Sequence, residues 1–277
     1  MNDPKLSLAF SPCPNDTFIF CGLVNGLIGK TDFSPGQIAY EDVETLNKRA
    51  FDSIHDVTKL SFYAYGHVRD RYSLLTAGSA LGRGCGPILV KANGSAGRNF
   101  AGKKIAIPGK FTTAAMLLKL YLPEAQPVET RFERIMPMVV RGEVDAGVII
   151  HESRFTYPRH GLIKVMDLGE WWEDMTGCPL PLGGIAILKT HSEETRTSIE
   201  AAIRASIKYA QENLDLCMPY IKKYAQELDD EVIQDHISLY VNSFSEDLGR
   251  EGEKAVRVFL EKGQKAGLLP CRSNQIF

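Results

Sequence analysis

The chain has 277 residues, of which 44% are hydrophobic and 24% are charged, as in an ordinary globular protein. This composition excludes disordered, collagen-like and membrane-spanning chains. The formal net charge is −2, and no dense cluster of Lys and Arg appears, so we expect neither nucleic acid nor a membrane as a partner. The length exceeds one average domain and favours two lobes or one large α/β unit.

The N-terminal region has one short apolar run, residues 6–10, which is too short for a secretory signal or a membrane span. The six cysteines show neither a CxxC pair nor a zinc-like spacing. We therefore expect reduced thiols in a cytoplasmic protein, with Cys13 most simply a buried structural thiol.

Short β-rich runs alternate with helical stretches through the first two thirds of the chain. The expected strands are residues 6–10, 37–40, 57–60, 104–108, 127–132 and 145–150. The expected helical stretches that follow the first five are residues 17–27, 43–51, 61–67, a helix from 112, and 134–141. This alternation predicts βα units around mostly parallel sheets.

The last third of the chain has a different pattern. It predicts helices at residues 190–213, 229–244 and 252–266, with no convincing strand between them. Apolar residues recur at helical spacing in this region, which predicts a helical tail that covers a sheet formed earlier in the chain.

Two loop-like stretches rich in Gly, residues 77–87 and 177–184, bracket a central block of about ninety residues, the usual size of a small α/β lobe. We expect two lobes joined by a double crossover: residues 1–92, then 93–185, then a return to the first lobe with the helical tail at 186–277. Such a hinge forms a cleft, where a small ligand binds.

Two strand-to-helix turns are candidate anion sites. Residues 105–115 read as strand, tight loop and helix start, so backbone N–H groups and the hydroxyls of Thr112 and Thr113 could hold a carboxylate. Lys59 and Ser61 lie near the end of another strand, where open α/β folds present ligands. The alternatives are a simple N-cap threonine pair and a solvated surface lysine.

Two other strand ends carry polar residues. His151 follows a buried strand directly, and an ordinary histidine pKa of about 6.5 suits proton transfer at neutral pH. Structural and catalytic roles for His151 both remain open, whereas His236 beside an apolar helix stripe is expected to be structural. The proline-fixed loop 11–18 resembles a site, with Asn15 or Asp16 as a helix cap.

Two other motifs do not indicate a cofactor. The glycines of residues 82–86 run into a strand instead of opening a helix, so a dinucleotide site is not indicated. Three carboxylates in residues 41–44 are explained by an acidic helix start. We expect neither a metal nor an organic cofactor.

Six separated segments carry distinctive motifs. They are SPCPNDTFIF (11–20), EDVETLN (41–47), TKLS (58–61), GRGCGP (82–87), PGKFTTA (108–114) and GEVDAGVIIHESRFTY (142–157). In order and spacing they resemble the 1,4-dihydroxy-6-naphthoate synthases of the futalosine route to menaquinone. GEWWE (169–173) and YVNSFS (240–245) extend the resemblance over nearly the whole chain.

The resemblance implies a type II periplasmic-binding-protein fold used as a cytoplasmic enzyme. It implies a lyase, without metal or redox cofactor, that converts cyclic dehypoxanthinyl futalosine into 1,4-dihydroxy-6-naphthoate and a small sugar-derived fragment. The general base then falls on His151. The contacts to a small carboxylate substrate fall on Lys59, Leu60, Ser61, Thr112 and Thr113.

Two alternatives share this expected fold. A chorismate dehydratase of the same pathway also acts on a carboxylate, and a non-catalytic carboxylate-binding protein would use the same cleft.

Overall fold

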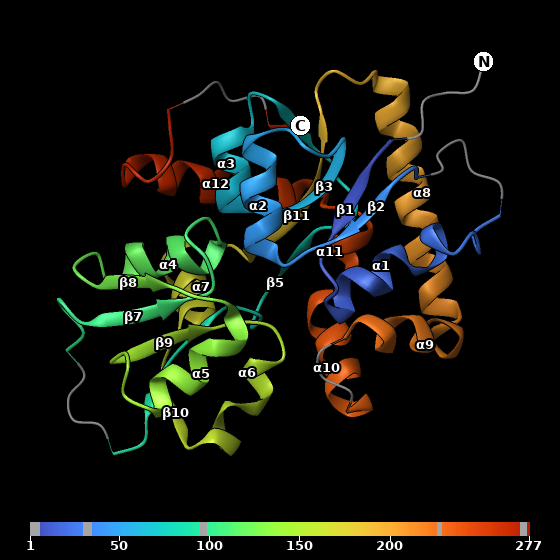
Figure 1. Cartoon of the computed structure of the whole chain (residues 1–277). Coiled ribbons are helices and arrows are strands. Elements are labelled where there is room, and N and C mark those ends of the chain that lie inside the picture. Colours follow the sequence, from blue (N-terminus) through green and yellow to red (C-terminus); the bar gives the residue numbers. More distant parts are fainter. Residues whose placement is uncertain (1–5, 30–34, 95–98, 226–228, 272–275) are drawn as a thin grey trace.

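The computed structural model describes residues 6–29, 35–94, 99–225, 229–271 and 276–277. Within them the chain forms two mixed β-sheets flanked by helices, and each sheet is the centre of one lobe (Figure 1). We call the lobe around the sheet that contains the first strand lobe 1, and the other lobe 2. Among the described helices, none combines the length and apolar character needed to cross a membrane.

The sheet of lobe 1 has the order β2-β1-β3-β11-β4, with β5 paired to β11. Its strands are β1 (Leu8–Phe10), β2 (Ile38–Tyr40), β3 (Val57–Ser61), β4 (Tyr72–Leu74), β5 (Ala80–Gly82) and β11 (Leu180–Leu188). β1 runs parallel to β2 and β3, whereas β11 is antiparallel to β3, β4 and β5. The helices between its early strands are α1 (Pro14–Val24), α2 (Val43–Phe51) and α3 (Phe62–Val68).

The sheet of lobe 2 has the order β10-β6-β9-β7-β8. Its strands are β6 (Ile88–Ala92), β7 (Lys104–Ile107), β8 (Gln126–Glu129), β9 (Ala146–Ile149) and β10 (Leu162–Asp167). The helices are α4 (Thr113–Tyr121), α5 (Phe132–Val140), α6 (Ser153–Thr156) and α7 (Leu168–Thr176), with a 3₁₀ turn at Tyr157–His160. β7 is parallel to β8 and β9, and β6 is antiparallel to β9 and β10.

The C-terminal helices return to lobe 1, as the sequence predicts. They are α8 (Glu193–Glu212), α9 (Leu214–Tyr224), α10 (Asp230–Tyr240), α11 (Ser243–Glu246) and α12 (Gly249–Lys265). α8, α9 and α10 pack on α1, and α12 packs on α3 and β11. One buried apolar cluster joins both lobes, since it includes Leu60, Leu89, Trp172 and Phe259. The predicted two-lobed fold with a helical tail is thus confirmed.

The double crossover is formed by two connections that lie side by side. The chain leaves lobe 1 after β5 and returns along β11, and these two strands pair at Leu180 with Gly82 and at Pro181 with Leu81. β6 already belongs to the sheet of lobe 2, so the chain enters that sheet before residue 93. The assignment of lobes to residues 1–92, 93–185 and 186–277 remains a proposal.

Several predicted elements are wrong in detail. The sheets are mixed and not mostly parallel, because both crossover strands, β6 and β11, run antiparallel to their neighbours. The stretch 177–184 is a loop only as far as Pro179 and then begins β11, the longest strand. Its glycines permit close packing, since a Cβ at Gly183 would lie 2.8 Å from the carbonyl oxygen of Leu60.

Other differences concern element bounds. The predicted strand 127–132 ends at Glu129, and Phe132 begins α5. The predicted helix 17–27 begins already at Pro14, and the predicted helix 229–244 ends at Tyr240. The sequence pattern does not predict β4, β10, α7 or α9, and the stretch 77–87, expected to be a loop, contains β5.

Candidate active site

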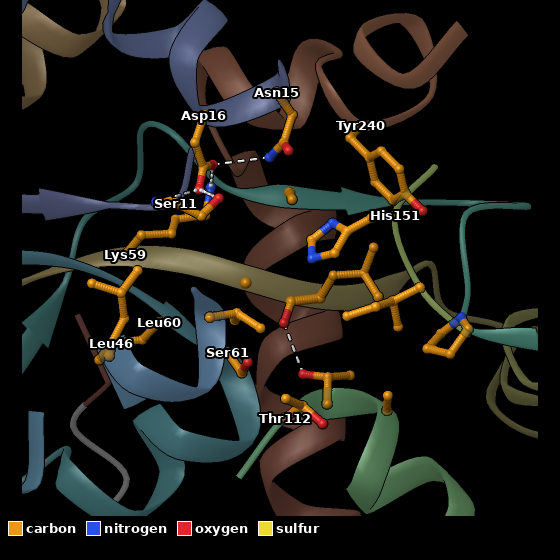
Figure 2. Close-up of a pocket in the computed structure, with 18 of the residues that line it drawn as sticks. Ser11, Asn15, Asp16, Leu46, Lys59, Leu60, Ser61, Thr112, His151 and Tyr240 are labelled. Carbon is orange, nitrogen blue, oxygen red and sulfur yellow. Dashed lines mark hydrogen bonds and ion pairs between the residues drawn. The ribbon is translucent and has the colours of Figure 1, made fainter. Parts of the chain in front are cut away.

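A cavity between the lobes is lined by all six residues that the sequence singles out: Lys59, Leu60, Ser61, Thr112, Thr113 and His151 (Figure 2). They come from β3 in lobe 1 and from the α4 start and the loop after β9 in lobe 2. Much of the remaining wall is apolar, with Val43, Leu46, Leu182 and Tyr240. The cavity therefore combines an apolar wall with a few converging polar groups, as small-molecule sites do.

His151 is placed by a strained turn at the end of β9. Its φ is +54°, a left-handed conformation that a non-glycine residue adopts at an energetic cost and that is found disproportionately at functional sites. The ring lies edge-on to Phe132, with centroids 5.1 Å apart. His151 Nε2 is 3.8 Å from Cys13 Sγ, a distance that suits a weak hydrogen bond to sulfur.

The electrostatic setting of His151 favours the neutral imidazole. Burial lowers the pKa of His151 from its ordinary value, while the charges of Glu152 and Asp16 act in the opposite direction. Burial also raises the pKa of the Cys13 thiol, so Cys13 stays protonated and does not have the lowered pKa that a nucleophilic cysteine needs. A neutral histidine at the cavity wall is suited to accept a proton.

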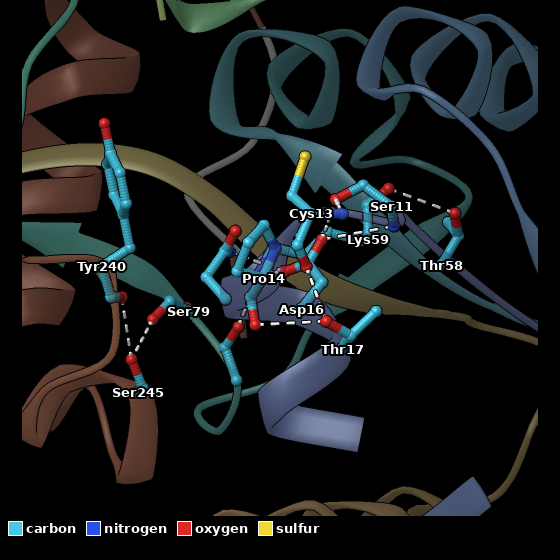
Figure 3. Close-up of polar contacts among 12 residues, drawn as sticks. Ser11, Cys13, Pro14, Asp16, Thr17, Thr58, Lys59, Ser79, Tyr240 and Ser245 are labelled. Carbon is cyan, nitrogen blue, oxygen red and sulfur yellow. Dashed lines mark hydrogen bonds and ion pairs between the residues drawn. The ribbon is translucent and has the colours of Figure 1, made fainter. Parts of the chain in front are cut away.

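Lys59 forms a buried ion pair with Asp16, and both residues line the cavity (Figure 3). Its Nζ lies 2.8 Å from Asp16 Oδ1 and donates a 2.9 Å hydrogen bond to the carbonyl of Gly78. Ser11 Oγ and Asn15 Nδ2 also donate to the Asp16 carboxylate, at 2.7 and 2.9 Å. Lys59 is thus already paired, and its predicted contact with a substrate carboxylate stays a prediction.

The same network corrects the predicted helix cap. The N-cap of α1 is Cys13, so neither Asn15 nor Asp16 caps this helix. Asp16 is instead the counter-ion of Lys59, which explains why a carboxylate is buried there with only 2% of its surface exposed.

The start of α4 presents backbone donors to the cavity. Thr112 is the N-cap, and its Oγ1 accepts a 3.2 Å hydrogen bond from the N–H of Ala115. Thr113 Oγ1 donates to the carbonyl of Leu182 at 2.8 Å, across the two lobes. The first-turn N–H groups of a helix have no intrahelical partner, and both Thr113 and Ala114 line the cavity. This helix end is therefore suited to an anion.

Ser61 lines the same cavity from lobe 1. It ends β3, and its N–H donates to Asn47 Oδ1 at 2.9 Å. Its Oγ accepts from Asn47 Nδ2 at 3.0 Å, which leaves the hydroxyl proton to donate to another group.

The structure adds site residues that sequence reasoning did not assign to the site. Asn15 and Tyr240 line the cavity, and both lie in segments that carried the family resemblance. His236 packs beside His151 with ring centroids 5.9 Å apart, which no local pattern indicated. A second pocket on the other side of His151 is more polar, with Glu41, Asp42, Arg131 and Glu152 in its wall.

Metal ligands do not gather here. Within the described residues, no three His, Cys, Asp or Glu side chains are arranged to hold an ion.

The fold and the site together define a class: a two-lobed, binding-protein-like α/β fold with a cavity between its lobes. The periplasmic aliphatic sulphonate binding protein SsuA from Escherichia coli has this fold, with a TM-score of 0.68 and 11% identity over 99% of this chain and 92% of its own. A crystal structure of an Archaeoglobus fulgidus protein is more similar, with a TM-score of 0.90 and 36% identity over 97% of this chain and all of its own.

Sequence comparison assigns the chain to one family. A family model described as menaquinone biosynthesis matches residues 6–265. A Thermus thermophilus protein named 1,4-dihydroxy-6-naphtoate synthase is 50% identical over 272 residues, 98% of either chain. A Streptomyces coelicolor protein of the same name is 39% identical over 281 aligned positions, 98% of this chain and 97% of its own. The chain belongs to the menaquinone biosynthesis family.

Proposed function

We propose that this protein is a carbon–carbon lyase that converts cyclic dehypoxanthinyl futalosine into 1,4-dihydroxy-6-naphthoate in menaquinone biosynthesis. The names of the two relatives support the product. The observation that carries the proposal is the cavity itself, which is lined both by His151 and by the first residues of α4.

The substrate carboxylate is held by the start of α4. The backbone N–H groups of Thr113 and Ala114 and the positive end of the helix bind it, and the Ser61 hydroxyl approaches from lobe 1. Leu60 and Lys59 form the wall beside it. The apolar wall around Leu46 and Leu182 packs on the aromatic ring that carries this carboxylate.

His151 is the general base. It removes a proton from the bound substrate so that the carbon framework fragments and becomes aromatic, and closure of the lobes excludes water from this step. The polar pocket behind His151 takes the sugar-derived fragment, because its carboxylates accept hydrogen bonds from hydroxyl groups.

We propose that side chains alone perform this chemistry, without a metal or a redox cofactor. The reaction is assigned to the cytoplasm, in keeping with the free thiols of the six cysteines.

The test is direct incubation of the purified protein with cyclic dehypoxanthinyl futalosine in the presence of EDTA, with chromatography and absorbance to follow the naphthoate. Product formation supports the lyase. Turnover of chorismate instead would identify a chorismate dehydratase. Saturable binding of either compound without product would identify a binding protein.

A further inference from the structure

His236 is a fully buried histidine that joins the candidate base to the other lobe. It lies on α10, and its ring stacks on that of His151 with centroids 5.9 Å apart and planes inclined by 19°. Tyr240, one turn further along α10, packs against His236 at 4.7 Å. His151 belongs to lobe 2, whereas α10 packs on α1 of lobe 1.

A chain of hydrogen bonds fixes the tautomer of His236. Asn15 Nδ2 donates to Asp16 Oδ1, which is anchored by Lys59, so the amide oxygen of Asn15 is the atom that faces His236. That oxygen lies 3.0 Å from His236 Nε2 and can only accept a hydrogen bond. His236 therefore carries its proton on Nε2, and its Nδ1 bears a lone pair.

The second ring nitrogen, Nδ1, shows that His236 is not simply a core residue whose polar atoms all have hydrogen-bond partners. His236 Nδ1 is buried without a hydrogen-bond partner, and Glu152 Oε2 lies 4.0 Å from it. An unpartnered buried polar atom destabilises the folded protein. An apolar ring would fill the same space and remove this nitrogen, but it would leave Asn15 Oδ1 without its donor, so packing alone does not account for a histidine here.

We propose that His236 is the positioning residue of His151: a neutral ring, fixed in its Nε2–H form, that holds the base against the cavity from the opposite lobe. This inference rests on the proposed role of His151 as general base. Because the stack joins the two lobes, the base is held in its reactive orientation only when the lobes are closed.

A neutral partner is the form that the chemistry requires. His151 becomes positively charged when it takes the proton, and a second charge on the stacked ring would oppose this. Burial and the neighbouring His151 lower the pKa of His236 well below its ordinary value. The charges of Glu152 and Asp16 both favour the protonated form of His151, and Lys59 is paired with Asp16. Cys13 and Tyr240 stay neutral because burial raises their pKa values.

The first test is ¹⁵N NMR of histidine-labelled protein without substrate. His236, assigned by its absence in His236→Phe, should show the Nε2–H tautomer and no titration between about pH 5.5 and 8.5. In His236→Ala, water fills the vacated space and the pKa of His151 should rise toward its ordinary value of about 6.5, whereas His236→Phe should keep it low. A titrating His236, an Nδ1–H tautomer, or an unmoved His151 in His236→Ala would overturn the proposal, whatever the substrate proves to be.

The second test compares turnover of the same variants. His236→Ala should lower kcat by about 50-fold or more with KM within about threefold, since misplacement of a catalytic group by about 1 Å can cost 10²-fold. His236→Phe retains a stacked neutral ring and should keep kcat within about fivefold of the wild type. His55→Ala is the control, because His55 is also buried but lies outside the cavity.

Two other outcomes of the turnover comparison would contradict the proposal. If His236→Phe is as slow as His236→Ala, His236 takes part in the chemistry itself and is not a positioning residue. If both variants, corrected for the folded fraction, turn over like the wild type, its role is only structural.

Discussion

The Glu44 carboxylate of lobe 1 accepts the backbone N–H of Phe111 in lobe 2, with N···O distances of 3.1 and 3.3 Å. Glu44 is buried on α2, and Phe111 lies in the loop before α4. This hydrogen bond therefore joins the two walls of the cavity directly beside the proposed carboxylate site.

Glu44→Ala should weaken lobe closure and raise KM. A hydrogen bond to a charged group contributes about 1.5–3 kcal/mol, so KM should increase about tenfold or more while kcat changes less. Steady-state kinetics with Glu143→Ala as the control checks this, because Glu143 pairs with Arg141 inside lobe 2. An unchanged KM in Glu44→Ala would show that this contact does not contribute to closure.

The buried pair of Lys59 and Asp16 should contribute strongly to stability. Lys59→Met leaves the Asp16 carboxylate in the interior without its counter-ion, and removing one partner of a buried pair costs about 3–5 kcal/mol. Urea unfolding should show this loss, whereas Lys208→Met, which breaks an exposed pair with Glu212, should change stability by less than about 1 kcal/mol. Equal losses in both variants would contradict the structural role of Lys59.

The pH dependence of the reaction should reflect the lowered pKa of His151. The base must be neutral, so kcat/KM should rise with pH and reach its plateau once the pH exceeds the His151 pKa. Because burial lowers this pKa, the rise should have its midpoint below pH 6.5 and the enzyme should be fully active at pH 7. A midpoint at or above pH 7 would contradict a buried neutral base at this position.

The charge of the ligand should decide its affinity if the start of α4 binds the carboxylate. Calorimetry can compare 1,4-dihydroxy-6-naphthoate with the corresponding carboxamide, which has a similar shape and no charge. The carboxylate should bind at least about tenfold more tightly, the equivalent of about 1.4 kcal/mol. Equal affinities would place the carboxylate elsewhere or leave it in solvent.

The sequence predicts the parts of this site that depend on local pattern. A buried apolar strand that stops at a polar residue places that residue at the sheet edge, and this pattern predicts Lys59, Ser61 and His151, which all line the cavity. Thr112 was found in the same way, since a threonine before an apolar helical run predicts an N-cap.

Other features depend on contacts between distant segments and left no local signal. β11 was partly missed because its Gly and Pro residues resemble a loop, although the glycines allow close packing on β3. The pairing of Lys59 with Asp16 brings together β3 and α1 within lobe 1, and the stacking of His236 on His151 arises only when the two lobes come together. The ion pair with Asp16 also explains why Lys59, although it lies near the end of a strand, is not simply a free group for binding a ligand.

The most direct test is the turnover of cyclic dehypoxanthinyl futalosine by the wild type and by His151→Ala, measured side by side. Binding of the product to each protein is measured as well, as a check that the cavity is intact. General-base assistance typically contributes 10²- to 10⁴-fold, so the variant should bind 1,4-dihydroxy-6-naphthoate normally and form it at least about 100-fold more slowly. Equal turnover by the two proteins would contradict the assignment of His151 as the base.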